Sequence, residues 1–580
     1  MYFTLAVSAA TAAGCAALVR TAQGADPRTM PIPGPAQVAW CSPDRRAAMV
    51  SWGTASPDGG PDRRVAGSHA GTIWADLAAR DPATVCARTG LARVDPVYLA
   101  EAPGAVVLSD RACWAAAVTG RLTAHDPVMA GAFLSLGYPV GEATPYRGVR
   151  ALGGGHEVRV TGGRLVMTRA RGEDDGGDAG GDLCQGTGGN AAAEVATALT
   201  EAVRPLGQVP LGQAPLGQAP LGRAAAPVEL SLTGGKDSRL VAAALTAAGV
   251  PFRARTHGVG RHPDVVIAGM IAGRLGIEHT VTEPRLPGTP GEADVLGRLR
   301  SAVLVGDGML SAFENVGSWV SQGEPTAAAR PVQVGGHGGE LLRGGYAQAA
   351  WRTPAALSAA GAAELFRRMT TRRLSLLRPA AAAAYLASLA PSAAALGRGP
   401  LSALDDFYLV NRAGRWSAAA RQAYLLRSPL AQPLFADRVV RAARAVPLWY
   451  RMSDRLHRAV LEALCPELAG LPLAGSPWHG EPRTPANALP APVALGDWRR
   501  DYGEGLARFL RGYVLDHGEA SPMFGIVRRR AAERSLRVPH ADPHAAWALA
   551  TLAALVSGDW LNAREPGFGT GRALAGRRRG

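Results

Sequence analysis

The sequence predicts an α/β protein with an antiparallel, strand-rich N-terminal half and a C-terminal half built on a parallel sheet with many helices. Short apolar runs separated by turn residues fill residues 1–170, and a strand–helix–strand rhythm begins at Val228. The remainder, to about residue 565, is rich in Ala, Leu and Arg at helical spacing. A chain of 580 residues is too long for one ordinary domain, so we expect two or three.

The composition is that of a globular protein, with 47% hydrophobic residues and a mean hydropathy of +0.02. The net charge of +15 comes from arginines spread along the chain, and no Lys/Arg block with interleaved aromatic residues occurs. The basic run 577–579 is interpreted as a solvated end. We therefore expect no nucleic-acid partner.

The cysteines and the apolar runs predict a cytoplasmic protein. The six cysteines show no CxxC spacing, which is typical of a reduced chain without a structural zinc site. The apolar start lacks the cationic region of a signal peptide, because the first arginine is Arg20. No stretch of 18 uninterrupted, strongly apolar residues is present, so we expect no membrane contact.

The N-terminal half is predicted to contain several short antiparallel strands in layers. Thr161, Gly162 and Gly163 mark the turn of a hairpin between two alternating runs. The predicted strands are residues 2–7, 36–42, 46–53, 104–110 and the two arms of the hairpin within 156–170.

Two segments join the halves. Residues 171–190 are acidic and rich in glycine, which is typical of a linker. A helix is predicted over 191–203, followed by four copies of PLGQ or PLGR within 205–223. This repeat is too rich in Pro and Gly for a solenoid and is interpreted as a surface loop.

A βαβαβ unit follows, with a glycine loop after its first strand, and it predicts a parallel sheet covered on its faces. The predicted elements are a strand at 228–232, a helix at 239–248, a strand at 252–258, a helix at 263–275 and a strand at 277–282.

The glycine loop between the first strand and helix has the properties of an anion site. Backbone N–H groups and the helix dipole favour negative charge there, and Gly234 and Gly235 let a phosphate approach closely. Thr233 and Ser238 add hydroxyl donors. Asp237 would repel a bare phosphate, so it suggests a bridging Mg²⁺. Neither GxxxxGK[ST] nor GxGxxG fits the loop, which argues against a Walker A or Rossmann site.

The loop also holds Lys236, the only lysine among 62 basic residues. A compact ammonium fits beside a phosphate pocket lined by backbone more easily than the planar fork of arginine. We interpret Lys236 as a supplementary charge of this loop.

Two motifs resemble those of one enzyme family. The stretch 231-SLTGGKDSR-239 is similar to the SGGxDS loop of the PP-loop ATP pyrophosphatases, which cleave ATP between its α and β phosphates. The stretch 334-VGGHGGELLRGGY-346 resembles the (S/T)GxGxDExxGGY segment of the asparagine-synthetase family. Both motifs would follow strands of one parallel sheet, where open α/β sheets bind ligands.

This resemblance implies cofactors and site residues. The cofactors are ATP and Mg²⁺, with Asp237 and Glu340 as the metal ligands. The implied ATP-binding residues are Leu232, Thr233, Gly234, Gly235, Lys236, Asp237, Ser238, His257, Gly335 and Gly336.

Further segments extend the resemblance over nearly the whole chain. Residues 433–447 look like the family's PFLDxRLVEFALxLP segment, and residues 107–111 and 137–155 resemble the glutaminase-like domain of the Ntn type. The implied domains are a degenerate glutaminase-like domain at 1–170, the linker at 171–190 and a synthetase domain at 191–570 that contains the repeat loop.

The chain departs from the family at two places. A working glutaminase begins with cysteine after Met, but the second residue here is Tyr2, so no glutaminase activity is expected. The family also carries a C-terminal lysine that stabilises the acyl transition state. In 452-MSDRLHRAVL-461, Asp454 takes that position if Arg458 matches the family's arginine. Arg455, beside it, is the candidate replacement; the alternative is an ordinary amphipathic helix with an exposed arginine.

The combination looks most like the lasso-peptide cyclases. These adenylate an Asp or Glu side chain of a precursor peptide, and the N-terminal amine of the peptide closes a macrolactam with release of AMP and pyrophosphate. The resemblance implies a leader-binding protein and a leader protease as partners. His337 is the candidate acceptor of the amine proton, with a structural hydrogen bond as the alternative.

Three other functions remain open from the sequence. The first is an amide synthetase acting on a small molecule, as in β-lactam synthetase. The second is a PP-loop tRNA-modifying enzyme, which the net charge of +15 favours. The third is a scaffold without catalysis, which the presence of both Asp237 and Glu340 argues against.

Overall fold

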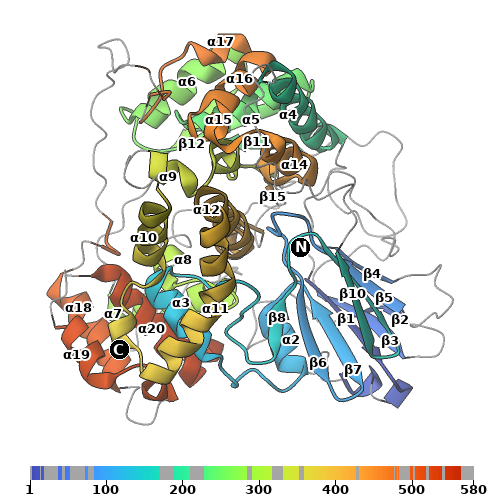
Figure 1. The fold of residues 1–580 in the computed structure, drawn as a ribbon, viewed down its shortest axis with the longest axis vertical. Helices are drawn as coiled ribbons and strands as arrows, with labels where there is room; N and C mark the ends of the chain where they lie inside the picture. Colours follow the sequence, from blue (N-terminus) through green and yellow to red (C-terminus); the bar gives the residue numbers. More distant parts are fainter. Residues whose placement is uncertain are drawn as a thin grey trace, which may run out of the picture.

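The computed structural model shows an α/β architecture in which two antiparallel sheets precede a five-stranded parallel sheet and many helices (Figure 1). The residues that it describes are 3–13, 15–18, 37–41, 46–52, 72–75, 84–169, 188–208, 227–283, 291–315, 331–351, 358–425, 430–475, 477–479, 481, 497–500, 503–516, 522–537 and 542–562.

The N-terminal half forms two antiparallel sheets, as predicted. The six-stranded sheet has the order β2–β3–β1–β7–β6–β8, and the four-stranded sheet has the order β10–β9–β5–β4. Their strands are β1 (Phe3–Ala9), β2 (Gln37–Cys41), β3 (Ala47–Trp52), β4 (Thr72–Ala75), β5 (Thr84–Arg88), β6 (Tyr98–Ala102), β7 (Ala105–Ser109), β8 (Val149–Ala151), β9 (His156–Thr161) and β10 (Arg164–Arg169). The hairpin is confirmed, because Thr161 pairs with Arg164 across two glycines with positive φ.

The strand β7 shows how the layers are built. Val106 and Leu108 join a small core with residues of β5 and β9, whereas Val107, on the other face, packs with the helices α2 (Ala112–Val118) and α3 (Pro127–Ser135). This alternation is the two-residue period of a strand buried on both faces. The N-terminal half is therefore a helix layer on two stacked sheets.

The C-terminal half contains the parallel sheet, in the order β13–β12–β11–β14–β15. The βαβαβ unit is confirmed, with β11 (Val228–Ser231), α5 (Lys236–Ala247), β12 (Phe252–His257), α6 (Pro263–Leu275) and β13 (His279–Thr282). The chain then returns to the other side of β11 to form β14 (Val332–Val334) and β15 (Leu430–Ala431).

Three boundaries differ from the predictions. The helix α5 begins at Lys236 and not at residue 239, because the acidic Asp237 is favourable in a first helical turn and Gly235 takes the N-cap position. The end of the predicted linker is helical, since α4 spans Gly188–Val203. The first PLGQ copy forms a 3₁₀ turn at Arg204–Gln208. Residues 170–187, residues 209–223, Tyr2, Cys184 and the run 577–579 lie outside the described residues.

The remaining described elements are mostly helical, as predicted. They are α7 (Glu292–Val305), α8 (Ala312–Asn315), η2 (Gly339–Arg343), α9 (Ala347–Trp351), α10 (Ala359–Thr370), η4 (Leu374–Leu376), α11 (Pro379–Arg398), α12 (Pro400–Phe407), η5 (Tyr408–Ser417), α13 (Ala418–Leu425), η6 (Pro433–Phe435), α14 (Asp437–Ala445), α15 (Leu448–Met452), α16 (Arg455–Leu464), α17 (Pro466–Ala469), α18 (Glu504–Asp516), η8 (Pro522–Gly525), α19 (Arg529–Ser535), α20 (Pro543–Ser557) and η9 (Asp559–Asn562). The element η5 is a π-helix of ten residues.

The two halves share one hydrophobic core. Its members include Val7 and Phe133 from the N-terminal half and Leu304 and Trp547 from the C-terminal half. Asp307, which follows α7, accepts hydrogen bonds from the backbone N–H groups at the start of α2, one of them 2.9 Å long. A carboxylate at a helix N-terminus is favoured by the helix dipole. The halves are thus joined by apolar burial and by a cap supplied across the junction.

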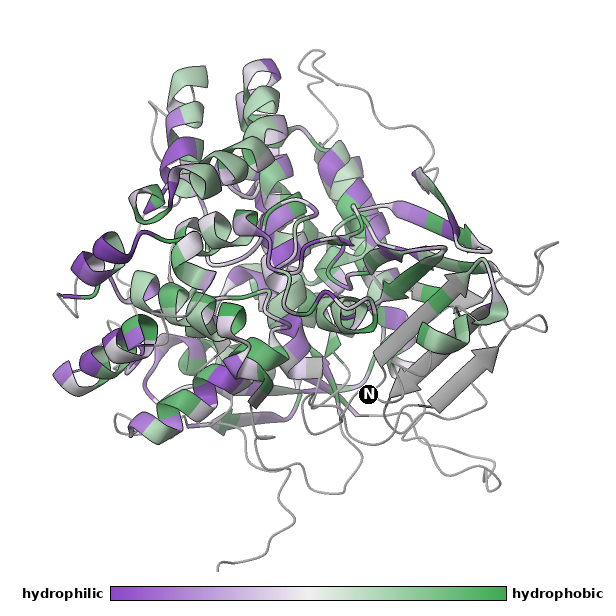
Figure 2. Cartoon of the chain, turned by 90° about the horizontal axis from the view of Figure 1, so that it is seen from below, coloured by the Kyte–Doolittle hydropathy of each residue, from purple (hydrophilic) through white to green (hydrophobic). Residues whose placement is uncertain are grey.

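One described helix, α11, is long and apolar enough to cross a membrane by length and composition. A single helix of this kind is weak evidence for a span, and α11 carries Pro391 in its interior. It packs against α3 and α12 through buried residues such as Tyr385 and Leu389. Hydrophilic and hydrophobic residues are interspersed along the described helices in Figure 2.

The contact between α3 and α11 makes a testable packing constraint. A Cβ added at Gly131 of α3 would lie 2.4 Å from the ring of Tyr385, so Gly131→Ala is expected to destabilise the fold by about 1–3 kcal/mol. Gly297→Ala is the matched control, because nothing lies within 4 Å of its added Cβ in α7. There the alanine should stabilise by about 0.5–1 kcal/mol through helix propensity. Thermal unfolding of both variants checks this, and a Gly131→Ala protein as stable as wild type would contradict it.

Candidate functional site

The two glycine loops lie next to each other at the point where the strand order of the parallel sheet reverses. The first loop (residues 233–238) follows β11, and the second loop (residues 335–340) follows β14, its parallel neighbour. The chain moves from β11 to β12 and β13 on one side and returns to β14 on the other. Ligands of open α/β sheets bind at this switch point, outside the carboxyl ends of the strands. The predicted placement of Asp237 and Glu340 is therefore confirmed.

The first loop is held in shape by its own side chains. The Ser238 hydroxyl lies 3.0 Å from the Thr233 hydroxyl and accepts a hydrogen bond from the Thr233 N–H, also at 3.0 Å. The Gly234 N–H donates to the Asp264 carboxylate at 2.9 Å. The Gly235 N–H donates to the Thr233 hydroxyl at 3.2 Å. These bonds fix the turn into α5.

The start of α5 is open to an anion. The N-cap residue is Gly235, which has no side chain to accept from the first N–H groups of the helix. The helix is twelve residues long, so its dipole adds a partial positive charge at this end. Buried Arg239 joins the start of α5 to the segment around α17, because its guanidinium donates to the carbonyls of Leu468 and Leu471 at 3.1 and 2.9 Å.

The second loop packs directly on this helix start. A Cβ at Gly336 would lie 2.6 Å from the Ser238 nitrogen, and one at Gly339 would lie 2.1 Å from the Asp237 carboxylate. Only glycine allows so close an approach. The two sequence motifs, about a hundred residues apart, therefore form one surface.

Asp237 is the central acid of this surface. Its Oδ2 accepts a hydrogen bond from Arg343 at 3.0 Å, whereas its Oδ1 is buried and has no hydrogen-bond partner among the described residues. Burial raises the pKa of Asp237 to about 6; Arg343 opposes the shift and the negative charge of Glu340 adds to it. Ionisation of Asp237 in the folded protein is thus unfavourable relative to water, and its Oδ1 is left for a ligand.

Glu340 behaves differently although it lies beside Asp237. Burial works to raise its pKa, but Arg343, a backbone N–H group and the Tyr408 hydroxyl outweigh burial and lower it. Glu340 is therefore ionised at neutral pH. Arg343 keeps its own pKa raised despite burial, through the charges of Asp237, Glu340 and Asp454.

The pair Asp237 and Glu340 fits Mg²⁺. A magnesium ion needs only one or two carboxylates from the protein when phosphates and water complete its shell. The Oδ1 of Asp237, which has no hydrogen-bond partner within the described parts of the chain, is the atom available to such an ion. Among the described residues no group of three or more His, Cys, Asp or Glu side chains gathers as a metal site, so an ion here would depend on the nucleotide for further ligands.

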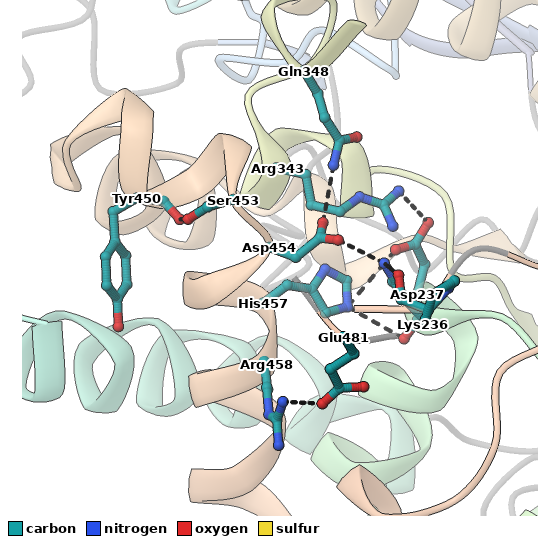
Figure 3. Close-up of polar contacts among 11 residues, drawn as sticks. Lys236, Asp237, Arg343, Gln348, Tyr450, Ser453, Asp454, His457, Arg458 and Glu481 are labelled. Carbon is teal, nitrogen blue, oxygen red and sulfur yellow. Dashed lines mark hydrogen bonds and ion pairs between the residues drawn. The ribbon is translucent and has the colours of Figure 1, made fainter. Parts of the chain in front are cut away.

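Lys236 points across the site toward the start of α16 (Figure 3). Its ammonium lies 2.6 Å from the Asp454 Oδ2, 3.2 Å from the Pro477 carbonyl oxygen and 4.8 Å from the centre of the Trp478 ring. Gln348 donates to the other oxygen of Asp454 at 2.9 Å. Burial lowers the pKa of Lys236, although the hydrogen bond to Asp454 opposes the shift.

His457 lies one turn further along α16 and is fully buried. Its Nε2 is 3.2 Å from the Lys236 carbonyl oxygen and 3.7 Å from the Asp237 Oδ1. Burial, together with the charge of Arg343, lowers its pKa well below the usual range, so the ring is neutral. With Nε2 as the donor, His457 ties α16 to the first turn of α5.

Two predicted histidines lie at the rim. His257 ends β12 beside the first loop, and His337 lies in the second loop; both are exposed to solvent. Desolvation by the surrounding protein lowers the pKa of His337, and the charges of Arg412 and Arg421 lower it further against the effect of Glu340. The ring of His337 is therefore neutral at pH 7, the form that can accept a proton.

Arg455 does not join this cluster. It is exposed at the start of α16, and its guanidinium lies 5.8 Å from the ring centre of Trp449, which is itself exposed. Arg458 points toward Glu481 (Figure 3), and it also pairs with Glu462 one turn along the helix. The sequence expectation that Arg455 supplies the missing positive charge is not supported by its position, because successive helical residues face different directions.

Sequence reasoning missed Arg343, Gln348 and His457, and it did not foresee the contact between Lys236 and Asp454. The signal available for His457 was its spacing: it is three residues from Asp454, and residues three apart share a helix face. Arg343 was inside the second motif, at a position where the family pattern specifies no residue.

The N-terminal half reaches this site through the π-helix η5. Asn411 of η5 accepts from the Gly141 N–H at 2.8 Å, and Arg93 donates to the Val410 carbonyl at the same distance. At the start of η5, Tyr408 holds Glu340. Elsewhere the Tyr138 hydroxyl lies 2.9 Å from that of Tyr346, at the end of the second motif.

Comparison with known proteins finds no match: no protein-family model matches the chain, and no curated protein matches its sequence.

The raised pKa of Asp237 predicts a pH-dependent stability. Its folded pKa of about 6 exceeds the usual 3.8, so the folded protein loses stability as pH rises through 6, by about 3 kcal/mol at most. Asp237→Asn removes this loss. In the absence of metal and nucleotide, the unfolding temperature of the variant minus that of wild type should increase as the pH is raised from 4.5 to 8.

Asp294→Asn, which removes a carboxylate that is 69% exposed on α7, is the matched control. Unfolding temperatures are measured for the three proteins across this pH range. A difference between Asp237→Asn and wild type that stays constant with pH would contradict the assigned burial of the charge.

Proposed function

We propose that this chain is an ATP-dependent carbon–nitrogen ligase that activates a carboxylate by adenylation and then forms an amide. The observation that carries the proposal is the position of Asp237 and Glu340 after adjacent parallel strands, beside an uncapped helix start. Anion-binding N–H groups and a pair of carboxylates in one place suit a metal-bound nucleoside triphosphate.

The protein groups divide the work on ATP. The N–H groups in the first turn of α5 would bind the negatively charged terminal phosphates of ATP, and Asp237 and Glu340 would hold Mg²⁺. The metal, when bound, would neutralise charge on the departing pyrophosphate. A substrate carboxylate oxygen attacks the α phosphorus, the bond between the α and β phosphates breaks, and pyrophosphate leaves into the first loop.

The amide forms in a second step. The amine nitrogen attacks the acyl carbon, the bond from that carbon to the AMP oxygen breaks, and AMP departs. The amine must lose a proton, and neutral His337 is the acceptor that we assign. Its position in the second loop, three residues before Glu340, supports that role.

The substrate that we propose is a precursor peptide whose Asp or Glu side chain is joined to its own N-terminal amine. The support is the resemblance of the second motif to the lasso-peptide cyclases. An internal amine requires no ammonia, and a folded peptide supplies a high effective concentration of the nucleophile. A leader-binding protein and a leader protease are the partners that this function implies, and the cytoplasm is the proposed location.

The adenylation step is tested by exchange of labelled pyrophosphate into ATP in the presence of Mg²⁺ and carboxylate-bearing peptides. Asp237→Asn and Glu340→Gln are each expected to reduce exchange by about a hundredfold or more, the usual loss when an electrostatic partner of a transition state is removed. The control Asp294→Asn, at an exposed position in the first turn of α7, should catalyse pyrophosphate exchange at the wild-type rate. Exchange by Asp237→Asn at the wild-type rate would overturn the assigned site.

The amide step is tested with synthetic peptides that have a free N-terminal amine and a single Asp or Glu at successive positions. We expect AMP to form together with a peptide lighter by one water, detected by mass spectrometry. Release of AMP without dehydration of any peptide would contradict macrolactam formation. Dehydration of a small amino acid in place of the peptides would instead identify a small-molecule synthetase.

A further inference from the structure

The sole lysine of the chain and the acid at the start of α16 form a buried ion pair inside the proposed site. The exposed fractions of their side chains are 11% for Lys236 and 7% for Asp454. Charged side chains are rarely buried without a partner, because removing each ion from water costs several kcal/mol. Both charges are thus retained at a cost to the fold.

Asp454 is placed for this contact and not for its own helix. It occupies the N-cap of α16, where aspartate normally accepts from the first N–H groups, yet its side chain makes no such bond. Its backbone has φ of +60°, a left-handed conformation that is unfavourable for a residue other than glycine. One carboxylate oxygen accepts from Lys236, and the other accepts from Gln348.

Lys236 has donor capacity to spare. An ammonium has three N–H groups, and the described residues provide two acceptors: the Asp454 carboxylate and the Pro477 carbonyl. Trp478 covers one side of the ammonium, and 24% of the neighbouring Asp237 side chain remains exposed. A third N–H group therefore remains for a ligand beside the carboxylate.

The other cation of the cluster, Arg343, lies among carboxylates. Arg343 faces three carboxylates, with a 3.0 Å hydrogen bond to Asp237 and the charges of Glu340 and Asp454 acting on it. The candidate Arg455 is exposed and lies over Trp449. Arg343 also has a buried Nε without a hydrogen-bond partner among the described residues, but three carboxylates act on its charge, whereas the Lys236 ammonium contacts one, Asp454.

We propose that Lys236, oriented by Asp454, is a catalytic residue that stabilises the negative charge developing on the carbonyl oxygen of the acyl group during amide formation. The positive charge that the sequence analysis assigned to Arg455 is thus supplied by Lys236 from α5, and Asp454 holds the ammonium in position. This inference rests on the proposed function. It assigns Lys236 to the second step and Asp454 as its positioning residue.

The principal test moves the ammonium to the other side of the pair. Lys236→Met alone leaves Asp454 buried without its partner and risks unfolding, so two double variants are compared: Lys236→Met/Asp454→Leu and Lys236→Met/Asp454→Lys. They differ only at residue 454. Peptide dehydration should fall about a hundredfold or more in the Leu variant and recover at least about tenfold in the Lys variant.

Pyrophosphate exchange separates this inference from the proposed function. If the wild type shows neither exchange nor peptide dehydration, the proposed function fails. If the Leu variant exchanges within about tenfold of wild type but no longer dehydrates peptides, the inference is supported. If the Leu variant dehydrates peptides at the wild-type rate, Lys236 is not catalytic. Equal dehydration rates for the folded Leu and Lys variants would also overturn the assignment.

The single lysine allows a direct measurement that requires no turnover. Protein grown with ¹³C-lysine carries the label at one side chain, so its Cε resonance reports Lys236 alone. Adding AMP with Mg²⁺ should shift this resonance, because the AMP oxygen is the leaving group on the acyl carbon, and the shift should be smaller in Asp454→Asn because the ammonium is no longer held. A resonance unchanged at saturating AMP would contradict the placement of Lys236 beside the acyl group.

Discussion

The proposed site depends on the ionised carboxylate of Asp237 being kept where its Oδ1 has no hydrogen-bond partner among the residues that the structure describes. Burial and the nearby charge of Glu340 oppose that ionisation, and together they raise the pKa of Asp237 to about 6 although Arg343 acts in the other direction. The surrounding residues offset part of the cost: Arg343 donates to Oδ2, and the start of α5 contributes its dipole. A metal ion would remove the rest, so the site stores free energy that ligand binding releases.

This constraint explains the packing of the second loop. Gly339 has no room for a side chain because the Asp237 carboxylate occupies the space, and Arg343 reaches that carboxylate from the end of the same short 3₁₀ helix η2. The Arg451 guanidinium, from α15, stabilises η2 by donating to the Leu341 carbonyl at 2.9 Å. The N-terminal half acts on the same loop through η5, whose first residue, Tyr408, holds Glu340. That half thus contributes to the geometry of the acid pair whatever its other role.

The sequence predicted the parts of the fold that depend on local pattern. The hairpin at 156–169 and the βαβαβ unit follow from alternation, glycine turns and helix caps, and all three are local signals. The adjacency of β11 and β14 came from the resemblance of two motifs. What the sequence could not supply was direction. Arg455 and His457 are two positions apart on one helix, and only the packing of α16 on α5 decides that His457 faces the site and Arg455 faces solvent.

The same limit applies to the lone lysine. Its place in the first loop suggested a phosphate contact, because the loop has glycines and a helix start that favour anions. The first turn of α5 instead directs the Lys236 side chain toward the start of α16, where it contacts Asp454, a residue with positive φ. The compact ammonium of Lys236 lies between the Asp454 carboxylate, the Pro477 carbonyl and the Trp478 ring, and the planar fork of arginine would have a different reach and geometry at this position. The charge at this point is therefore defined by the geometry of two helix starts, and neither sequence segment reveals it alone.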